Sequence, residues 1–225
     1  DFEQAAALIE RAVPATRRNR QDATLRGWLQ ALPEEVLRHW PVLNAHYVGV
    51  LLQSGELDGV EVRLGDAERW LGEDVGATPD FADEEGFQRL PGLVALYHAA
   101  IALVRGDVAD AMTHARRVVE LAPEDDDFMR GAALSLLGLA AWTSGDLVTA
   151  HRTYADGMAN LHKAGYISDV IGGSVSLSDI RLTQGHLREA LSNYERGLQL
   201  ATQPGQPALR GAADMHVGMS DIYRE

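Results

Sequence analysis

Apolar residues recur at intervals of three and four along four segments of the chain. This spacing places side chains on one face of an α-helix. The clearest stripe consists of Leu147, Ala150, Tyr154, Met158 and Leu161. Similar stripes run through 57–71, 108–122 and 187–198. No useful length of sequence alternates apolar and polar residues as a strand does, so the pattern predicts an all-α fold.

A short glycine phrase opens each of these stripes. The four copies are Gly55-Glu56-Leu57, Gly106-Asp107-Val108, Gly145-Asp146-Leu147 and Gly185-His186-Leu187. Glycine suits a tight turn with positive φ between two helices. In three of the four phrases, the acidic residue just after the glycine favours the positive end of the next helix. Each phrase therefore predicts the turn inside a pair of helices.

The first helix of each pair precedes its glycine. We expect these first helices at roughly 41–53, 92–104, 127–143 and 167–183, with a last helix over about 207–225. The glycines are spaced by 51, 39 and 40 residues. The wide first interval indicates an insertion, which we place in a long loop over 72–90.

The first forty residues are also helical but lack the phrase. Leu25, Trp28, Leu29 and Leu32 share one helical face. We interpret 1–40 as an N-terminal helical cap, or a linker to a missing upstream domain, and 41–225 as repeats. The predicted repeats are 41–72, 91–123, 127–165, 167–203 and a partial 206–225.

The repeats resemble the tetratricopeptide repeat. The best copy has Leu137-Gly138 followed by Gly145, Ala150 and Tyr154, although the period near 40 exceeds the usual 34. This resemblance implies a right-handed superhelical solenoid of tetratricopeptide-like helix pairs. Such a solenoid has a concave binding face built from first helices.

A narrower resemblance begins at Leu25-Arg26-Gly27-Trp28-Leu29-Gln30-Ala31-Leu32-Pro33-Glu34-Glu35 and continues through Pro41-Val42-Leu43 to 51–57. It looks like the helical sensor region of the large ATP-binding LuxR-type transcription regulators. The resemblance implies a small-molecule inducer or a regulatory protein as partner. It also implies ATPase and DNA-binding domains in the same polypeptide. The sequence holds neither a G-x-x-x-x-G-K-[ST] phosphate loop nor a basic recognition helix.

Composition narrows the possible functions. The net charge of −13 disfavours nucleic acid and anionic membranes as partners of this segment. The absence of cysteine excludes thiolate metal sites and cysteine nucleophiles. The eight histidines are scattered, and Asp110 with His114 reads as a surface pair. We therefore expect no metal, no cofactor, no catalytic residues and no enzyme activity, and a cytoplasmic location without a membrane span.

The candidate ligand- or partner-binding residues follow from the repeat register, which places them on the concave face. Trp142 suits stacking on a sugar ring or on a partner's side chain, and ordinary interhelical packing is its alternative reading. The full set is Gln53, Ser135, Trp142, Asp179, Thr183 and Met219.

Two functions remain open. The first is a ligand- or partner-sensing module of a bacterial LuxR-type transcription regulator. The second is a generic tetratricopeptide scaffold that grips a peptide, which predicts a groove rich in Asn, Lys or Arg.

Overall fold

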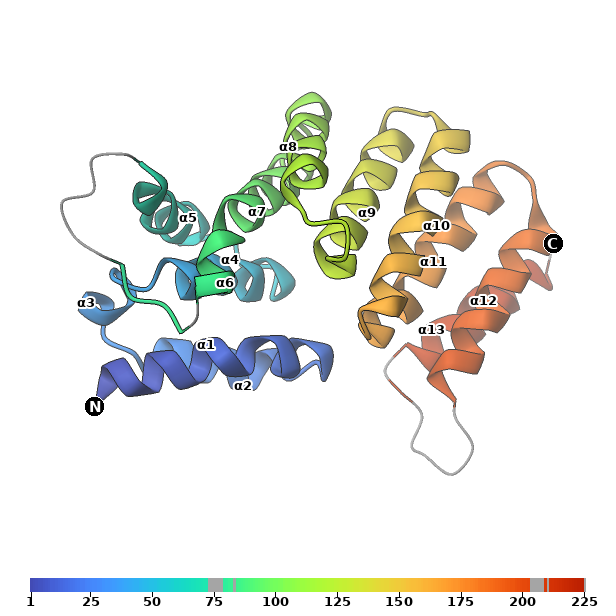
Figure 1. Ribbon diagram of the computed structural model, residues 1–225. Helices are drawn as coiled ribbons and strands as arrows, with labels where there is room; N and C mark the ends of the chain where they lie inside the picture. The colour runs from blue at the N-terminus through green and yellow to red at the C-terminus, as the bar shows by residue number, and fades with distance from the viewer. Residues whose placement is uncertain (73–78, 83, 203–208, 210, 225) are drawn as a thin grey trace. The chain divides into compact units, whose positions relative to one another are not determined.

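The computed structural model describes residues 1–72, 79–82, 84–202, 209 and 211–224. These residues form helices joined by turns, and none of them lies in a β-strand (Figure 1). The all-α prediction is confirmed. The chain divides into two compact units, Asp1–His98 and Ala99–Glu225. Each unit is described separately below.

The first unit is built around one apolar helix. It contains α1 (Phe2–Arg18), α2 (Asp22–Gln30), α3 (Glu34–Leu37), α4 (Pro41–Gln53), α5 (Val60–Glu68), a 3-10 turn (Arg69–Leu71), α6 (Glu84–Gln88) and the start of α7 (Leu90–Val104). Helix α4 is apolar on nearly every side, and such a helix is stable only when neighbours surround it. It contacts α1, α2, α3, α5 and α6. Leu43, Val48 and Val50 of α4 are fully buried.

The segment before α6 is hydrogen-bonded to two earlier parts of the first unit. The Asp80 amide donates to the His39 carbonyl (2.7 Å), and the Ala82 amide donates to Glu10 Oε1 in α1 (2.6 Å). The prediction of a continuous loop over 72–90 is wrong, because this segment contains the short helix α6 and the start of α7. The part of that loop over 73–78 lies outside the described residues.

The second unit is a succession of helix pairs. After the end of α7 it contains α8 (Val108–Leu121), α9 (Asp127–Thr143), α10 (Leu147–Lys163), α11 (Ile167–Thr183), α12 (Leu187–Ala201) and α13 (Ala212–Ile222). From α9 to α13 each helix packs on the one before it. This arrangement confirms a helical-repeat solenoid of tetratricopeptide-like pairs. The last helix is shorter than the predicted 207–225, and 207, 208, 210 and 225 lie outside the described residues.

The turns form as the glycine phrases require. Gly106, Gly145 and Gly185 have φ of +80°, +83° and +78°, a conformation that costs other residues about 1 kcal/mol or more. The acidic residue after two of these glycines caps the next helix. Asp107 and Asp146 each accept a hydrogen bond from the backbone amide three residues later (3.0 Å).

Glycine also sets the closest approach within the α9–α10 pair. A Cβ at Gly138 would lie 2.7 Å from Tyr154 Cβ and 2.8 Å from Tyr154 N. A Cβ at Gly131 would lie 2.9 Å from the Leu161 amide nitrogen, and one at Gly157 would lie 2.8 Å from Ser135 N. The two helices thus meet backbone to backbone, which no larger residue at these positions permits.

Candidate functional site

The six predicted binding residues are divided between the two units. Gln53 ends α4 in the first unit, and the other five lie in the second. With its amide nitrogen toward Asp22, Gln53 donates to that carboxylate (2.9 and 3.2 Å) and accepts from Arg17 Nη2 (2.9 Å). Gln53 therefore joins the end of α4 to α1 and α2. Its role in binding stays a prediction.

Ser135 and Trp142 both make packing contacts. The Ser135 hydroxyl donates to the Gly131 carbonyl (2.7 Å) and lies where α9 meets Gly157 of α10. Trp142 is half-buried and packs against the cluster that contains Ala150 and Ile180. These contacts agree with the interhelical alternative for Trp142. No observation tests a binding role for either residue.

Asp179 and Thr183 share one face of α11. Asp179 Oδ1 accepts a hydrogen bond from the Tyr194 hydroxyl of α12 (3.3 Å), and the exposed Thr183 hydroxyl donates to the Asp179 carbonyl (2.8 Å). Partial burial raises the pKa of Asp179, and the hydrogen bond from Tyr194 opposes that rise. The hydrogen bond from the Tyr194 hydroxyl thus fixes the orientation of the half-buried Asp179 carboxylate.

Tyr194 is the residue around which this face is organised. Its ring is buried, and burial together with the nearby Asp179 raises its pKa to about 12. Met219 of α13 packs against the core cluster that includes Tyr194 and Met215. The sequence analysis places Tyr194 only in an apolar stripe. The one signal that could have indicated its role is that it occupies the aromatic position of the repeat, which Tyr154 holds in the best copy.

This surface, hereafter the α11 face, consists of the exposed residues Gly172 and Thr183 and the half-buried residues Ser176 and Asp179. These residues follow one another at helical spacing of four, three and four. Gly172 is exposed, and a Cβ there would have no neighbour within 4 Å. The α11 face therefore presents a carboxylate, two hydroxyls and an uncovered stretch of backbone.

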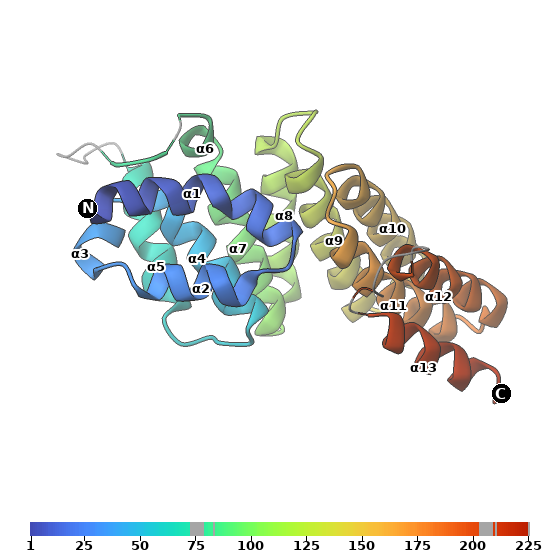
Figure 2. The same cartoon turned by 90° about the horizontal axis from the view of Figure 1, so that it is seen from below.

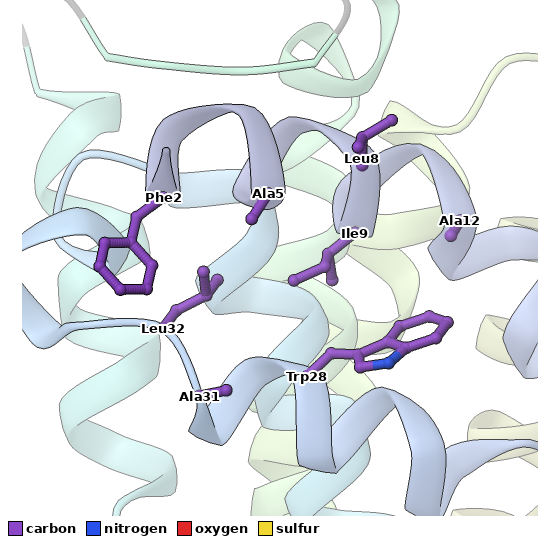
Figure 3. A pocket seen from close by; sticks show the side chains of 8 residues that line it. All are labelled: Phe2, Ala5, Leu8, Ile9, Ala12, Trp28, Ala31 and Leu32. Carbon is purple, nitrogen blue, oxygen red and sulfur yellow. The ribbon is translucent and has the colours of Figure 1, made fainter.

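A second candidate surface lies in the first unit, between α1 and α2. It is an apolar groove of about 480 Å³ (Figure 3). We call it the α1–α2 groove, and it is lined by Phe2, Ala5, Leu8, Ile9, Ala12, Trp28, Ala31 and Leu32. The sequence placed Trp28 on one helical face with Leu25, Leu29 and Leu32; those three leucines are buried, whereas Trp28 is 41% exposed. The signal that could have indicated this groove is a second apolar stripe along α1, in addition to the stripe that packs into the core of the first unit.

The predicted surface pair of Asp110 and His114 is present in α8. His114 Nε2 lies 3.5 Å from Asp110 Oδ1 on the surface of α8, as the predicted surface pair requires. Across the described residues, no three His, Asp or Glu side chains are grouped so that they could hold a metal ion. Within the same residues, no helix is long and apolar enough to cross a bilayer.

The stacked pairs of the second unit, with their glycine turns and close interhelical contacts, define a tetratricopeptide-type repeat protein. The family described as the MalT-like TPR region matches residues 92–225, which is more than half of the chain. The chain belongs to this family. A search of curated proteins found no match.

Proposed function

We propose that this chain is the ligand- or partner-binding sensor module of a bacterial LuxR-type transcription regulator. It acts in the cytoplasm, by binding rather than by catalysis. Its signal passes to the ATPase and helix-turn-helix domains of the same polypeptide. Membership of the MalT-like TPR region family and the phrase over 25–37 support this proposal.

The observation that carries the proposal is the α11 face. Asp179 and Thr183 offer an acceptor and a hydroxyl to the hydrogen-bonding groups of a ligand, and Tyr194 holds the carboxylate in a fixed position. Preorganised polar groups lose little conformational entropy on binding. A bound ligand changes the module only if it binds two of its conformations with different affinity. The polar ligand that fits is a sugar or another small hydroxylated metabolite.

The test is thermal unfolding of the full chain with a panel of sugars and small hydroxylated metabolites. A ligand that binds the folded state raises the unfolding midpoint. Asp179→Asn and Thr183→Ala should abolish that rise. Thr113→Ala is a matched control, because Thr113 is exposed on α8 and its hydroxyl also donates to the carbonyl four residues earlier (3.0 Å).

Two results would count against the proposal. The first is that no compound in the panel raises the unfolding midpoint. The second is that Thr113→Ala removes the ligand-induced rise of the midpoint as fully as Thr183→Ala does. Binding of extended peptides without any response to small molecules would favour a generic tetratricopeptide scaffold instead.

A further inference from the structure

A short segment of the first unit adds little to its core. Among the described residues 79–82 and 84–88 none is buried, and the half-buried rings of Phe81 and Phe87 stack on each other (5.2 Å between centroids). Helix α6 lies beside α1 in both views (Figure 1, Figure 2). Segments with few buried apolar contacts open locally at low cost. We call residues 79–82 the strap, and we expect it to leave α1 without unfolding of the core.

The strap is held to its neighbours by main-chain hydrogen bonds. The Ala82 amide donates to Glu10 Oε1 (2.6 Å), and Arg11 Nη2 donates to the Ala82 carbonyl (3.2 Å). Two positions earlier, the Asp80 amide donates to the His39 carbonyl (2.7 Å). The adjacent residues Glu10 and Arg11 of α1 therefore bind both main-chain groups of one strap residue.

These bonds follow the pattern of an extended chain that is paired along one edge. In extended backbone, the N–H and C=O groups of one residue lie on the same edge as those of the residue two positions away. Asp80 and Ala82 are two positions apart, and the groups that they offer are all main-chain groups. The surface that receives them therefore recognises a backbone conformation more than a set of side chains.

The Glu10 carboxylate determines what can replace the strap. Glu10 is only 5% exposed, and Ala6 and Val13 on the same face of α1 are fully buried. Water reaches such a carboxylate poorly, and burial of a carboxylate is costly unless hydrogen-bond donors compensate it. Loss of the Ala82 amide removes one such donor. The site therefore favours a replacement that brings an N–H group to the same place.

The spacing of the receiving groups selects an extended peptide. The donors for Glu10 and for the His39 carbonyl are two residues apart, which is about 7 Å along an extended chain. The N–H groups inside an α-helix already bond to their own carbonyls, so a helix cannot supply these donors. An extended segment has free N–H groups at this spacing.

We propose that Glu10, Arg11 and the His39 carbonyl form a binding site for an extended peptide of a partner protein, and that the strap fills this site as a built-in competitor. The peptide has an aromatic residue followed by a small one, as in Phe81 and Ala82, which are both half-buried at the site. Main-chain bonds supply the affinity of such a complex, and the side chains supply its selectivity. This proposal does not depend on the proposed function of the α11 face.

The experiment uses the full chain and a dye-labelled peptide, Gly-Ser-Pro-Asp-Phe-Ala-Gly-Ser, in a fluorescence anisotropy titration. In the parent chain the strap competes at the effective concentration of a tethered ligand, which is about millimolar. Replacing both Asp80 and Ala82 with proline removes the two N–H donors of the strap, whereas replacing both with serine keeps them. The peptide should bind the double-proline variant at least about tenfold more tightly than the parent or the double-serine variant.

Two substitutions in the double-proline variant test the location of binding. Arg11→Ala removes the donor for the peptide carbonyl and should weaken binding by about fivefold. Arg18→Ala is the matched control, because Arg18 is also an exposed arginine of α1 that donates to a backbone carbonyl (Pro14, 3.3 Å), and it should leave the affinity unchanged. A probe that is N-methylated at its alanine lacks the N–H for Glu10 and should bind at least about tenfold more weakly. Thermal unfolding checks that all variants fold.

Hydrogen–deuterium exchange of the parent chain tests the proposal without any substitution. If the strap leaves while the core stays folded, the amides of Asp80 and Ala82 should exchange faster than that of Val48 in α4. Excess unlabelled peptide should accelerate exchange at both strap amides, because the peptide takes the place of the strap. A peptide that only stabilised the fold elsewhere would not accelerate it.

Any of four results would overturn the proposal. The first is that the peptide binds the double-proline variant no more tightly than the parent, or does not bind it at all. The second is that the N-methylated probe binds as tightly as the unmodified one. The third is that Arg18→Ala weakens binding as much as Arg11→Ala. The fourth is that excess peptide leaves exchange at the strap amides unchanged, and this result alone decides if the double-proline variant does not fold.

Discussion

Replacing Gly138 with alanine tests the closest helix contact in the second unit. The added Cβ would lie 2.7 Å from Tyr154 Cβ and within 2.9 Å of two Tyr154 backbone atoms. Ordinary contacts of a Cβ begin near 3.4 Å, so α9 and α10 would have to separate by about 0.7 Å. No rotamer change relieves this clash, because the atoms belong to backbone and Cβ.

The expected cost follows from two opposing effects. Overpacking a well-packed interface costs about 1–3 kcal/mol, and more when the backbone must shift. Alanine returns up to about 1 kcal/mol through its higher helix propensity. We therefore expect Gly138→Ala to lower the free energy of unfolding by about 2 kcal/mol. For a chain of this length the thermal midpoint should fall by roughly 4–8 °C.

Gly172→Ala is the matched control, because it changes the same atoms inside α11 where a Cβ meets nothing within 4 Å. Only the propensity effect remains there, so this variant should gain about 0.5–1 kcal/mol. Urea unfolding followed by far-UV circular dichroism measures both changes. If Gly138→Ala were as stable as the parent, or if Gly172→Ala lost as much as Gly138→Ala, backbone contact would not be what limits the α9–α10 pair.

Three further predictions concern capping and pH. Asp126→Ala removes the side chain that caps the Met129 amide of α9 (3.0 Å), so it should lower the free energy of unfolding by about 1 kcal/mol, as measured by urea unfolding. Asp125 is exposed, and Asp125→Ala should leave the free energy of unfolding almost unchanged. Equal losses in the two variants would contradict the capping role of Asp126. Hydrogen bonds from Thr149 lower the pKa of Asp146 below 3.8, so the cap should stabilise the fold above that pH, and this stability should be lost as pH falls through the lower folded-state pKa. Asp146→Asn should still cap α10, but without this acid dependence. A stability–pH profile that Asp146→Asn leaves unchanged would contradict the assignment. Burial, with the nearby Arg17 charge, lowers the pKa of His46 from 6.5 to about 3, so His46 binds a proton at higher pH in the unfolded chain than in the folded chain. The urea midpoint of the first unit should therefore fall as pH drops from 6.5 toward 3. His46→Gln should flatten this slope, and an equally steep profile in the variant would refute the assignment.

Helix bounds in the second unit could be predicted closely because their signals are local. The predicted first helices 127–143 and 167–183 match α9 and α11 residue for residue. Gly145 and Gly185, with positive φ, follow the ends of α9 and α11, and the side chains of Asp126 and Asp146 cap the starts of α9 and α10. Helix α6 was missed because a helix of five residues shows no periodicity.

The binding residues were harder to predict, for a physical reason. A first helix in a repeat array packs against neighbours on two sides, so its sequence carries more than one apolar stripe. Which remaining face stays exposed depends on the crossing of the next helix. Ser135 illustrates the difficulty, since its position in the repeat favours the concave face while Gly157 allows α10 to approach until it covers that side. Thr183, the last residue of α11, is exposed.

Contacts in the second unit also indicate where it can change shape. Within the α9–α10 pair, Gly138 and Gly157 bring backbone against backbone, and such contacts leave no room for sliding. Between pairs, Gly173 of α11 faces the thioether of Met158 in α10, a side chain that repacks readily. Ligand binding at the α11 face should therefore shift α11 against α10 while the α9–α10 pair moves as one body. Hydrogen–deuterium exchange with and without ligand measures this, and protection changes that begin within α9 would contradict the reasoning.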